Sequence, residues 1–113
     1  MPASTITRYQ VRADARDEAE RLMRAHADAV RATQPDASWS VYRDRRAPTT
    51  YVAVAHAVGP DAATRQQAAQ EAFRSALAPL LDGAIDEREL ELVTSSDLQR
   101  RFRGPTRRPR SRR

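Results

Sequence analysis

The chain has 113 residues, which is the usual size of a single domain. It contains no cysteine, which excludes disulfides, thiolate nucleophiles and cysteine-ligated metals. All 20 basic residues are arginine, and eight of these lie in residues 100–113, where there is no acidic residue. The other 12 arginines and all 15 acidic residues lie in residues 1–99, so this part is mildly acidic although the whole chain has a net charge of +5.

The beginning of the chain, Met-Pro-Ala-Ser-Thr-Ile-Thr, has neither a basic region nor an apolar run, so no signal peptide is expected. No apolar stretch approaches the roughly 20 residues that a membrane helix needs. We therefore expect a cytoplasmic protein that does not associate with a membrane.

The first predicted elements are a strand and a helix. Residues 5–12 are rich in Thr, Ile, Tyr and Val, which suit a half-buried strand, and place Tyr9 on one face with Thr7. Residues 13–33 carry apolar side chains at spacings of three and four, typical of an amphipathic helix with His26 on its apolar side. Asp14 is the expected N-cap of this helix.

A β-hairpin is predicted from Ser38 to Val58, with a polar turn at residues 45–48. Such a turn places Tyr42 opposite Tyr51. Both faces of the second hairpin strand are apolar, which favours burial on both sides, by helices on one and by a partner sheet on the other.

The second helix is expected at residues 64–78, with Thr64 and Gln67 as a capping box and Pro79 at its end. A last strand is expected at residues 87–94. The order strand, helix, strand, strand, helix, strand predicts an α+β, ferredoxin-like fold, an antiparallel sheet with two helices on one face. Residues 1–96 are the expected domain, and residues 97–113 an arginine-rich, disordered tail.

These segments resemble the antibiotic biosynthesis monooxygenase (ABM) domains, over roughly residues 6–95. The resemblance is one of pattern and order, and rests on Ile-Thr-Arg-Tyr-Gln-Val-Arg at 6–12, Trp-Ser-Val-Tyr-Arg at 39–43, Thr-Tyr-Val-Ala-Val-Ala at 50–55, Ala-Phe-Arg-Ser-Ala-Leu-Ala-Pro-Leu-Leu at 72–81 and Glu-Leu-Glu-Leu-Val at 89–93. It implies a dimeric α+β barrel, hence a homodimer, with a pocket between sheet and helices in each protomer. It also implies an oxygenase that needs no metal, flavin or other cofactor and acts on an aromatic or polyketide-like molecule.

The sequence departs from the catalytic patterns of that family. Haem-degrading relatives use a pocket asparagine, and this chain has no asparagine. Polyketide-oxidising relatives carry an asparagine and a tryptophan on the third strand, where this chain aligns Ala53 and Ala57. An alanine-lined pocket suits binding of a hydrophobic molecule, so a non-catalytic homodimer that binds a small molecule is the alternative.

Two histidines are the candidate catalytic residues. His56 could abstract a proton from a phenolic substrate and so start a cofactor-free oxygenation; otherwise it lies on the sheet face or at the dimer seam. His26 could act as a base or orient a ligand, or it could be a core histidine bonded to backbone or water. The two lie thirty residues apart and have no companion ligands, so no metal site is expected.

Aromatic residues of the sheet are the candidate ligand-binding residues. Tyrosines can stack on an aromatic ligand and donate hydrogen bonds, although they also stabilise sheets by packing. Trp39 could form a pocket wall, or it could belong to the core or to the dimer interface. Arg43 could bind a carboxylate or phenolate of a ligand, or it could be solvated or salt-bridged on the surface. The full predicted set is Tyr9, Trp39, Tyr42, Arg43 and Tyr51. Nucleic acid is not an expected partner, except through phosphate contacts of the arginine-rich tail.

Overall fold

Four strands and two long helices make up the described part of the chain, which in this computed structural model is residues 2–94 and 96. The strands are β1 (Pro2–Gln10), β2 (Ala37–Arg43), β3 (Thr50–Val58) and β4 (Asp86–Leu90), and the helices are α1 (Arg16–Thr33) and α2 (Pro60–Leu77). Short 3-10 turns, η1 (Ala13–Ala15) and η2 (Ala78–Leu80), adjoin the two helices.

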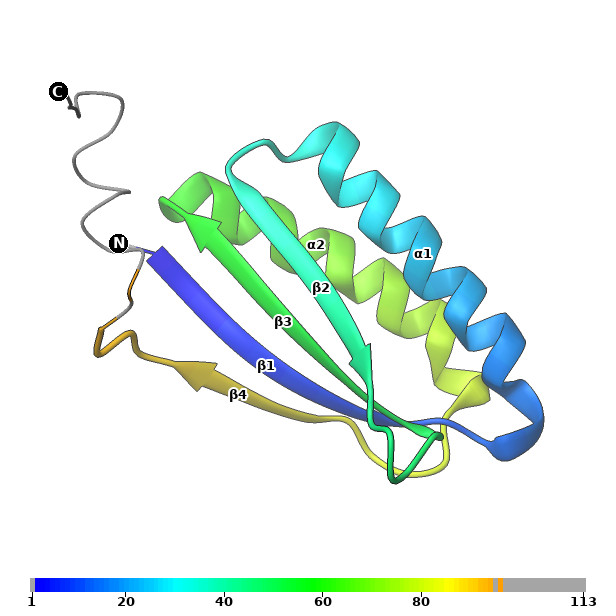
Figure 1. The fold of residues 1–113 in the computed structure, drawn as a ribbon. Helices are drawn as coiled ribbons and strands as arrows, with labels where there is room; N and C mark the ends of the chain where they lie inside the picture. The colour runs from blue at the N-terminus through cyan, green and yellow to red at the C-terminus, as the bar shows by residue number, and fades with distance from the viewer. Residues whose placement is uncertain (1, 95, 97–113) are drawn as a thin grey trace, which may run out of the picture.

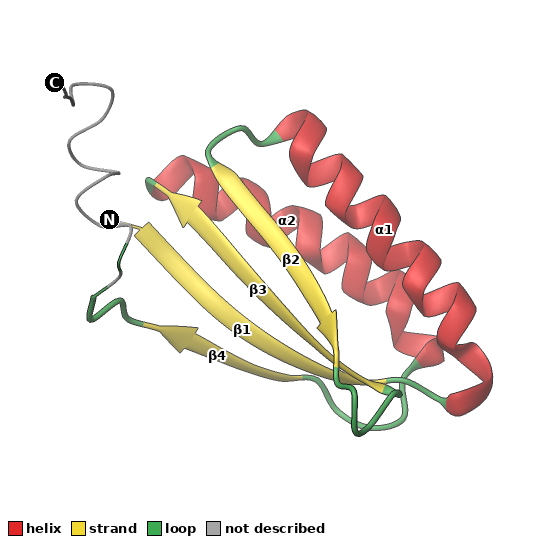
Figure 2. Cartoon of the chain, viewed as in Figure 1, coloured by secondary structure: helices red, strands yellow, loops and turns green. Residues whose placement is uncertain are grey.

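The strands form one antiparallel sheet in the order β2-β3-β1-β4. Both helices cover the same face of this sheet, and no other described residues cover the opposite face (Figures 1 and 2). This is the ferredoxin-like arrangement. The predicted α+β fold class and the predicted order of elements are therefore confirmed.

The helix-facing side of the sheet is built from small and aromatic side chains. Thr7 and Tyr9 of β1 are buried there, as are Tyr51 and three alanines of β3, at positions 53, 55 and 57. Alanine projects little from a strand and leaves space above β3. Large side chains from other elements must fill this space if the core is to be closely packed.

Aromatic side chains supply much of that volume at the centre of the core. His26 of α1 stacks on Phe73 of α2, with ring centroids 4.6 Å apart and planes inclined by 14°. Trp39 of β2 presents an edge to His26 at 4.7 Å, and Tyr9 lies edge-on to Phe73 at 6.0 Å. Edge-on and offset contacts are the favoured geometries of aromatic pairs. This cluster therefore joins both helices to strands β1 and β2.

The register of the β2–β3 hairpin differs from the prediction. Tyr51 lies opposite Arg43, and Tyr42 lies opposite Val52. The cause is a longer loop: the backbone N–H of Thr50 donates to the carbonyl of Ala47, and that of Asp44 donates to the carbonyl of Thr50. Because side chains alternate along a strand, this one-residue shift puts Tyr42 on the open face and Tyr51 on the helix face. The predicted Tyr42–Tyr51 pair is wrong.

The starts of both helices also differ from the prediction. Asp14 does not cap α1, because it lies within η1 and its carboxylate pairs with Arg12. Helix α2 begins at Pro60, four residues before the predicted start, so Thr64 lies inside the helix and cannot be its N-cap. Gly59 makes this early start feasible, since its φ of 87° is a conformation that other residues rarely adopt.

The last strand ends earlier than predicted. β4 ends at Leu90 rather than at residue 94, and it pairs with β1 only from Asp86 to Leu90. The predicted tail, residues 97–113, lies outside the described residues.

Candidate functional site

A hollow lies between α2 and the sheet, on the side of β4. We call it the α2 cleft. It has a volume of about 470 Å³ and is open to solvent. Its sheet side is formed by Thr5, Ala55 and Ala57, and its other lining residues are Gln66, Gln67, Gln70, Glu71, Arg74, Glu87 and Glu89.

The α2 cleft follows from which residues α2 turns toward the sheet. The buried positions of the helix are Ala62, Gln66, Gln70, Phe73 and Leu77, at spacings of three and four. The second half of the helix buries bulky apolar side chains, whereas the first half presents two glutamines to the alanines of β3. Small side chains on the strand and polar ones on the helix leave unfilled space between them.

Arg74 connects α2 to β4 at the edge of the cleft. Its guanidinium donates to both carboxylate oxygens of Glu87, at 2.6 and 3.1 Å, and to the side-chain oxygen of Gln70 at 3.2 Å. The hydrogen bonds to Glu87 raise the pKa of Arg74, so the guanidinium is charged at any ordinary pH. The cleft thus contains a fixed cation with a fixed counter-charge.

The Tyr9 hydroxyl is buried close to this ion pair. It forms no hydrogen bond of acceptable geometry within the described chain, although Arg74 and Thr7 are its polar neighbours. Burial raises the pKa of Tyr9, and the nearby Arg74 charge partly opposes that rise. Tyr9 therefore remains a neutral phenol in the core and does not line the α2 cleft.

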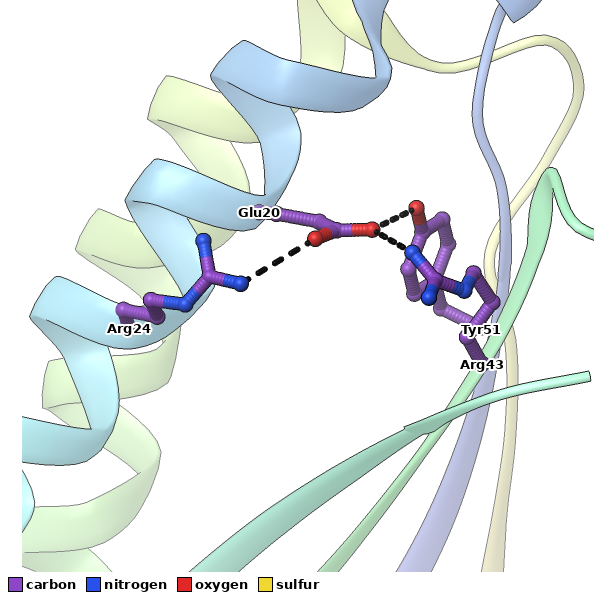
Figure 3. Close-up of polar contacts among 4 residues, drawn as sticks. All are labelled: Glu20, Arg24, Arg43 and Tyr51. Carbon is purple, nitrogen blue, oxygen red and sulfur yellow. Dashed lines mark hydrogen bonds and ion pairs between the residues drawn. The ribbon is translucent and has the colours of Figure 1, made fainter.

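A second polar cluster joins α1 to the β2–β3 hairpin (Figure 3). The carboxylate of Glu20 accepts hydrogen bonds from the Tyr51 hydroxyl at 2.6 Å, from Arg43 at 2.6 Å and from Arg24 at 3.3 Å. The Tyr51 bond is the main cause that lowers the pKa of Glu20. A shallower hollow of about 250 Å³ lies here, lined by these four residues together with Met23 and Val41.

The structure brings two predicted ligand-binding residues together, since Tyr51 and Arg43 meet at Glu20. It places Trp39 and His26 in the aromatic cluster with Phe73. Burial lowers the pKa of His26, which favours its neutral form. His26 lines neither the α2 cleft nor the hollow at Glu20.

Two predicted residues lie on the open face of the sheet. His56 is exposed there, and its Nδ1 lies 2.6 Å from the Ser4 hydroxyl. Tyr42 is 62% exposed on the same face. Neither contributes to the α2 cleft. Their roles, and that of His26, stay predictions.

Sequence reasoning missed the polar wall of the α2 cleft. The residues concerned are Gln66, Glu71, Arg74, Glu87 and Glu89. A helix begun at Pro60 would have shown Ala62, Gln66, Gln70, Phe73 and Leu77 as one stripe. The prediction began the helix at Thr64, which left Ala62 outside the helix and hid the start of this stripe.

Neither a metal centre nor a membrane helix is evident among residues 2–94 and 96. Within this part, no group of three or more His, Asp or Glu side chains is arranged to hold a metal ion. No helix of the same part is both long enough and apolar enough to span a bilayer.

The fold and the position of the cleft place this chain among the small α+β proteins in which two helices cover one antiparallel sheet. No protein-family model matches its sequence, and no curated protein matches it. Solved structures do match, and many of them are ABM proteins.

Three solved structures illustrate the similarity. Rv0793 from Mycobacterium tuberculosis is 18% identical with a TM-score of 0.74, over 85% of this chain and 99% of its own. A putative antibiotic biosynthesis monooxygenase from Caulobacter crescentus is 19% identical with a TM-score of 0.74, over 82% of this chain and 91% of its own. SnoaB, a cofactor-independent oxygenase from Streptomyces nogalater, is 23% identical with a TM-score of 0.69, over 84% and 96%. At these identities the comparison establishes a shared fold, so the resemblance to ABM domains is confirmed at that level.

Proposed function

We propose that this protein binds a small organic molecule in the α2 cleft. The observation that carries the proposal is a solvent-open hollow of about 470 Å³ into which two largely buried glutamines, Gln66 and Gln70, present their amides. Small-molecule sites have about 300–1,000 Å³, with a few convergent polar groups that fix the ligand's orientation. The apolar surface of Ala55 and Ala57 suits the flat face of an aromatic or polyketide-like ligand.

Heteronuclear NMR of the full chain with a set of hydroxylated aromatic fragments tests this proposal. Binding should shift the side-chain amide signals of Gln66 and Gln70 at lower fragment concentrations than those that shift other signals. Thr5→Tyr fills the cleft from β1 and should weaken binding at least about tenfold by removing space. The matched control is Ala72→Tyr, which adds the same side chain at an exposed position of α2 outside the cleft. Equal binding by both variants would rule out the α2 cleft as the site.

Cofactor-independent oxygenation is the second candidate function. It is supported by the fold shared with SnoaB, which is a cofactor-independent oxygenase, and by the Arg74 guanidinium in the cleft. In such a reaction an activated CH₂ group of a phenolic substrate loses a proton to a base. The carbanion reduces O₂ to a bound hydroperoxide, which eliminates water and leaves a carbonyl, so CH₂ and O₂ become C=O and H₂O. Arg74 would stabilise the anion that forms.

Oxygen uptake with a dihydroxyanthrone, corrected for the uncatalysed reaction, tests this activity. Arg74→Gln should lower the rate at least about tenfold if the guanidinium stabilises a developing anion. Arg65→Gln is the matched control, because Arg65 lies on the same helix but pairs with Asp36 outside the cleft. The oxygenase candidate fails if the protein accelerates uptake no more than serum albumin does. The predicted roles of His56 and His26 as bases are tested in the same assay by His56→Gln and His26→Gln.

We also propose that the protein is a homodimer that buries the open face of the sheet. Both helices pack on the other face, and the open face carries Tyr42, Val52, Val54 and Val58, with Tyr42 and Val58 more than half exposed. Contiguous exposed apolar surface of this kind marks an interaction site. Val54→Arg should give a monomer in sedimentation velocity, and the exposed Ala72→Arg on α2 should not. A wild-type monomer at about micromolar concentration would refute the dimer.

A further inference from the structure

The charge of the α2 cleft is unbalanced. Its lining includes three carboxylates, of Glu71, Glu87 and Glu89, and one guanidinium, of Arg74. Arg74 is already paired with Glu87 through two hydrogen bonds. Within residues 2–94 and 96, neither Glu71 nor Glu89 forms an ion pair. Two uncompensated carboxylates therefore face the same hollow, one from α2 and one from β4.

The buried glutamines of the cleft have unused hydrogen-bonding groups. Gln66 is 5% exposed, and its amide nitrogen donates to the Ser38 carbonyl at 3.1 Å. Gln70 is 7% exposed, and its amide oxygen accepts from Arg74 at 3.2 Å. A carbonyl can only accept and a guanidinium can only donate, so these partners fix which end of each amide is which.

The remaining end of each amide therefore has a defined character. Gln66 retains its side-chain oxygen, an acceptor, and Gln70 retains its NH₂ group, a donor. Neither free end has a hydrogen-bond partner within the described part of the chain. Neither atom is sealed off from solvent, so both free ends open onto the hollow. A ligand in the cleft can therefore bond to them without breaking any hydrogen bond of the protein.

We propose that the α2 cleft selects a cationic ligand, a small molecule with an ammonium or guanidinium group and at least one oxygen acceptor. The cationic group is held by Glu71 and Glu89 and donates to the side-chain oxygen of Gln66, while the ligand oxygen accepts from the Gln70 amide. This inference rests on the proposed binding function and adds the charge of the ligand to it. An anionic ligand meets two carboxylates, and the single guanidinium of Arg74, already paired with Glu87, offsets only part of that repulsion.

A charge series of phenols tests the inference on the full chain by NMR titration. Tyramine, tyrosol and 4-hydroxyphenylacetate have the same ring and hydroxyl and differ mainly in the charge of the side chain. Tyramine should bind at least about tenfold more tightly than tyrosol, the order expected for charge pairing at a partly exposed site, and 4-hydroxyphenylacetate should bind most weakly. The preference for tyramine should shrink as salt is raised, since salt screens the carboxylates.

Neutralising the carboxylates assigns the preference to these residues. The double variant Glu71→Gln and Glu89→Gln should lose at least about tenfold in tyramine affinity and bind tyramine and tyrosol alike. Glu91→Gln is the matched control, because Glu91 is also exposed and close to β4 but does not line the cleft. Thermal melting of each variant shows whether it is folded.

The outcomes separate the two proposals. If tyrosol or 4-hydroxyphenylacetate shifts the Gln66 and Gln70 amides at equal or lower concentration than tyramine, the cationic preference is overturned while binding in the cleft stands. The cationic preference is likewise overturned if the double variant still binds tyramine more tightly than tyrosol. If no probe shifts these amides at concentrations up to the solubility limit, both the cationic preference and the proposed binding function are overturned.

Discussion

Glu20 provides the sharpest test of how α1 is fixed to the sheet. Its carboxylate is largely shielded, with a side chain that is 20% exposed, and it accepts hydrogen bonds from Tyr51, Arg43 and Arg24 (Figure 3). These partners differ greatly in burial: Tyr51 is 2% exposed, whereas the side chains of Arg43 and Arg24 are 48% and 76% exposed. We therefore expect the Tyr51 bond to contribute most of the stabilisation.

The expected cost of Glu20→Ala follows from that difference. A hydrogen bond to a charged group contributes about 1.5–3 kcal/mol, and a buried donor left without a partner costs about 1–3 kcal/mol. Exposed ion pairs contribute little. The loss of the hydrogen bond and the cost of leaving the Tyr51 hydroxyl without a partner describe largely the same effect, so the two figures are not added. Glu20→Ala should therefore lower the free energy of unfolding by about 2–3 kcal/mol. Tyr51→Phe should cost about 1–2 kcal/mol, since it removes the donor and leaves the carboxylate with its arginines.

Urea unfolding followed by the fluorescence of Trp39, the single tryptophan, measures these costs. The control is Glu18→Ala, on the same helix, where an exposed carboxylate pairs with Arg21 and removal should change stability little. The double variant of Glu20→Ala and Tyr51→Phe should show a coupling of at least about 1 kcal/mol. Equal effects of the Glu20 and Glu18 variants, or a coupling near zero, would refute the reasoning.

The contribution of Glu20 to the free energy of unfolding should also depend on pH. The Tyr51 hydrogen bond lowers the pKa of Glu20 below its ordinary value of 4.5, so the stabilisation is complete above that pH. It is lost as the pH falls through the lower, folded-state pKa. Glu20→Gln should therefore lose less stability than the wild type when both are acidified below about pH 4.5.

Three further changes test other parts of the fold by urea unfolding. Burial lowers the pKa of His26 below its ordinary value of 6.5, so the unfolded chain takes up a proton first and the wild type should lose stability as the pH falls below 6.5. His26→Phe keeps the aromatic packing and should flatten this pH dependence; an unchanged slope would show that His26 is not its source. Phe73→Ala, at the centre of the aromatic cluster, should cost about 3–5 kcal/mol, and a cost below about 1.5 kcal/mol would contradict its place in the core. Gly59→Ala should cost about 1 kcal/mol because of its positive φ, since no atom lies within 4 Å of the added Cβ; a neutral effect would refute the required conformation.

The sequence predicted the elements of the fold well, for local reasons. The strand repeat correctly grouped Tyr9 with Thr7 on one face, and the helix repeat correctly put His26 on the apolar side of α1, because each face is set by that repeat alone. The hairpin register was not predictable in the same way. It depends on backbone hydrogen bonds in the loop at residues 44–50, and one residue of difference moved Tyr42 to the open face.

The candidate site was predicted less well than the fold. Large aromatic residues and histidines were the expected site residues, but His26 and Trp39 pack into the core and His56 lies on the open face. The α2 cleft is built instead from glutamines and charged residues of α2 and β4, which carry no motif. Arg74 and Glu87 are distant in sequence and meet only because β4 pairs with β1 next to the helix.

The sequence by itself determined the succession of strands and helices, the residues that share a face of β1 and of α1, and the concentration of eight arginines in residues 100–113. These properties depend on neighbouring residues and on composition. Only the tertiary structure decided which side chains meet: the Glu20–Tyr51 bond, the aromatic cluster around Phe73 and the polar wall of the α2 cleft. Such contacts depend on the hairpin register and on where α2 begins, because a shift of one residue on a strand, or a different start of a helix, turns other side chains toward the same space.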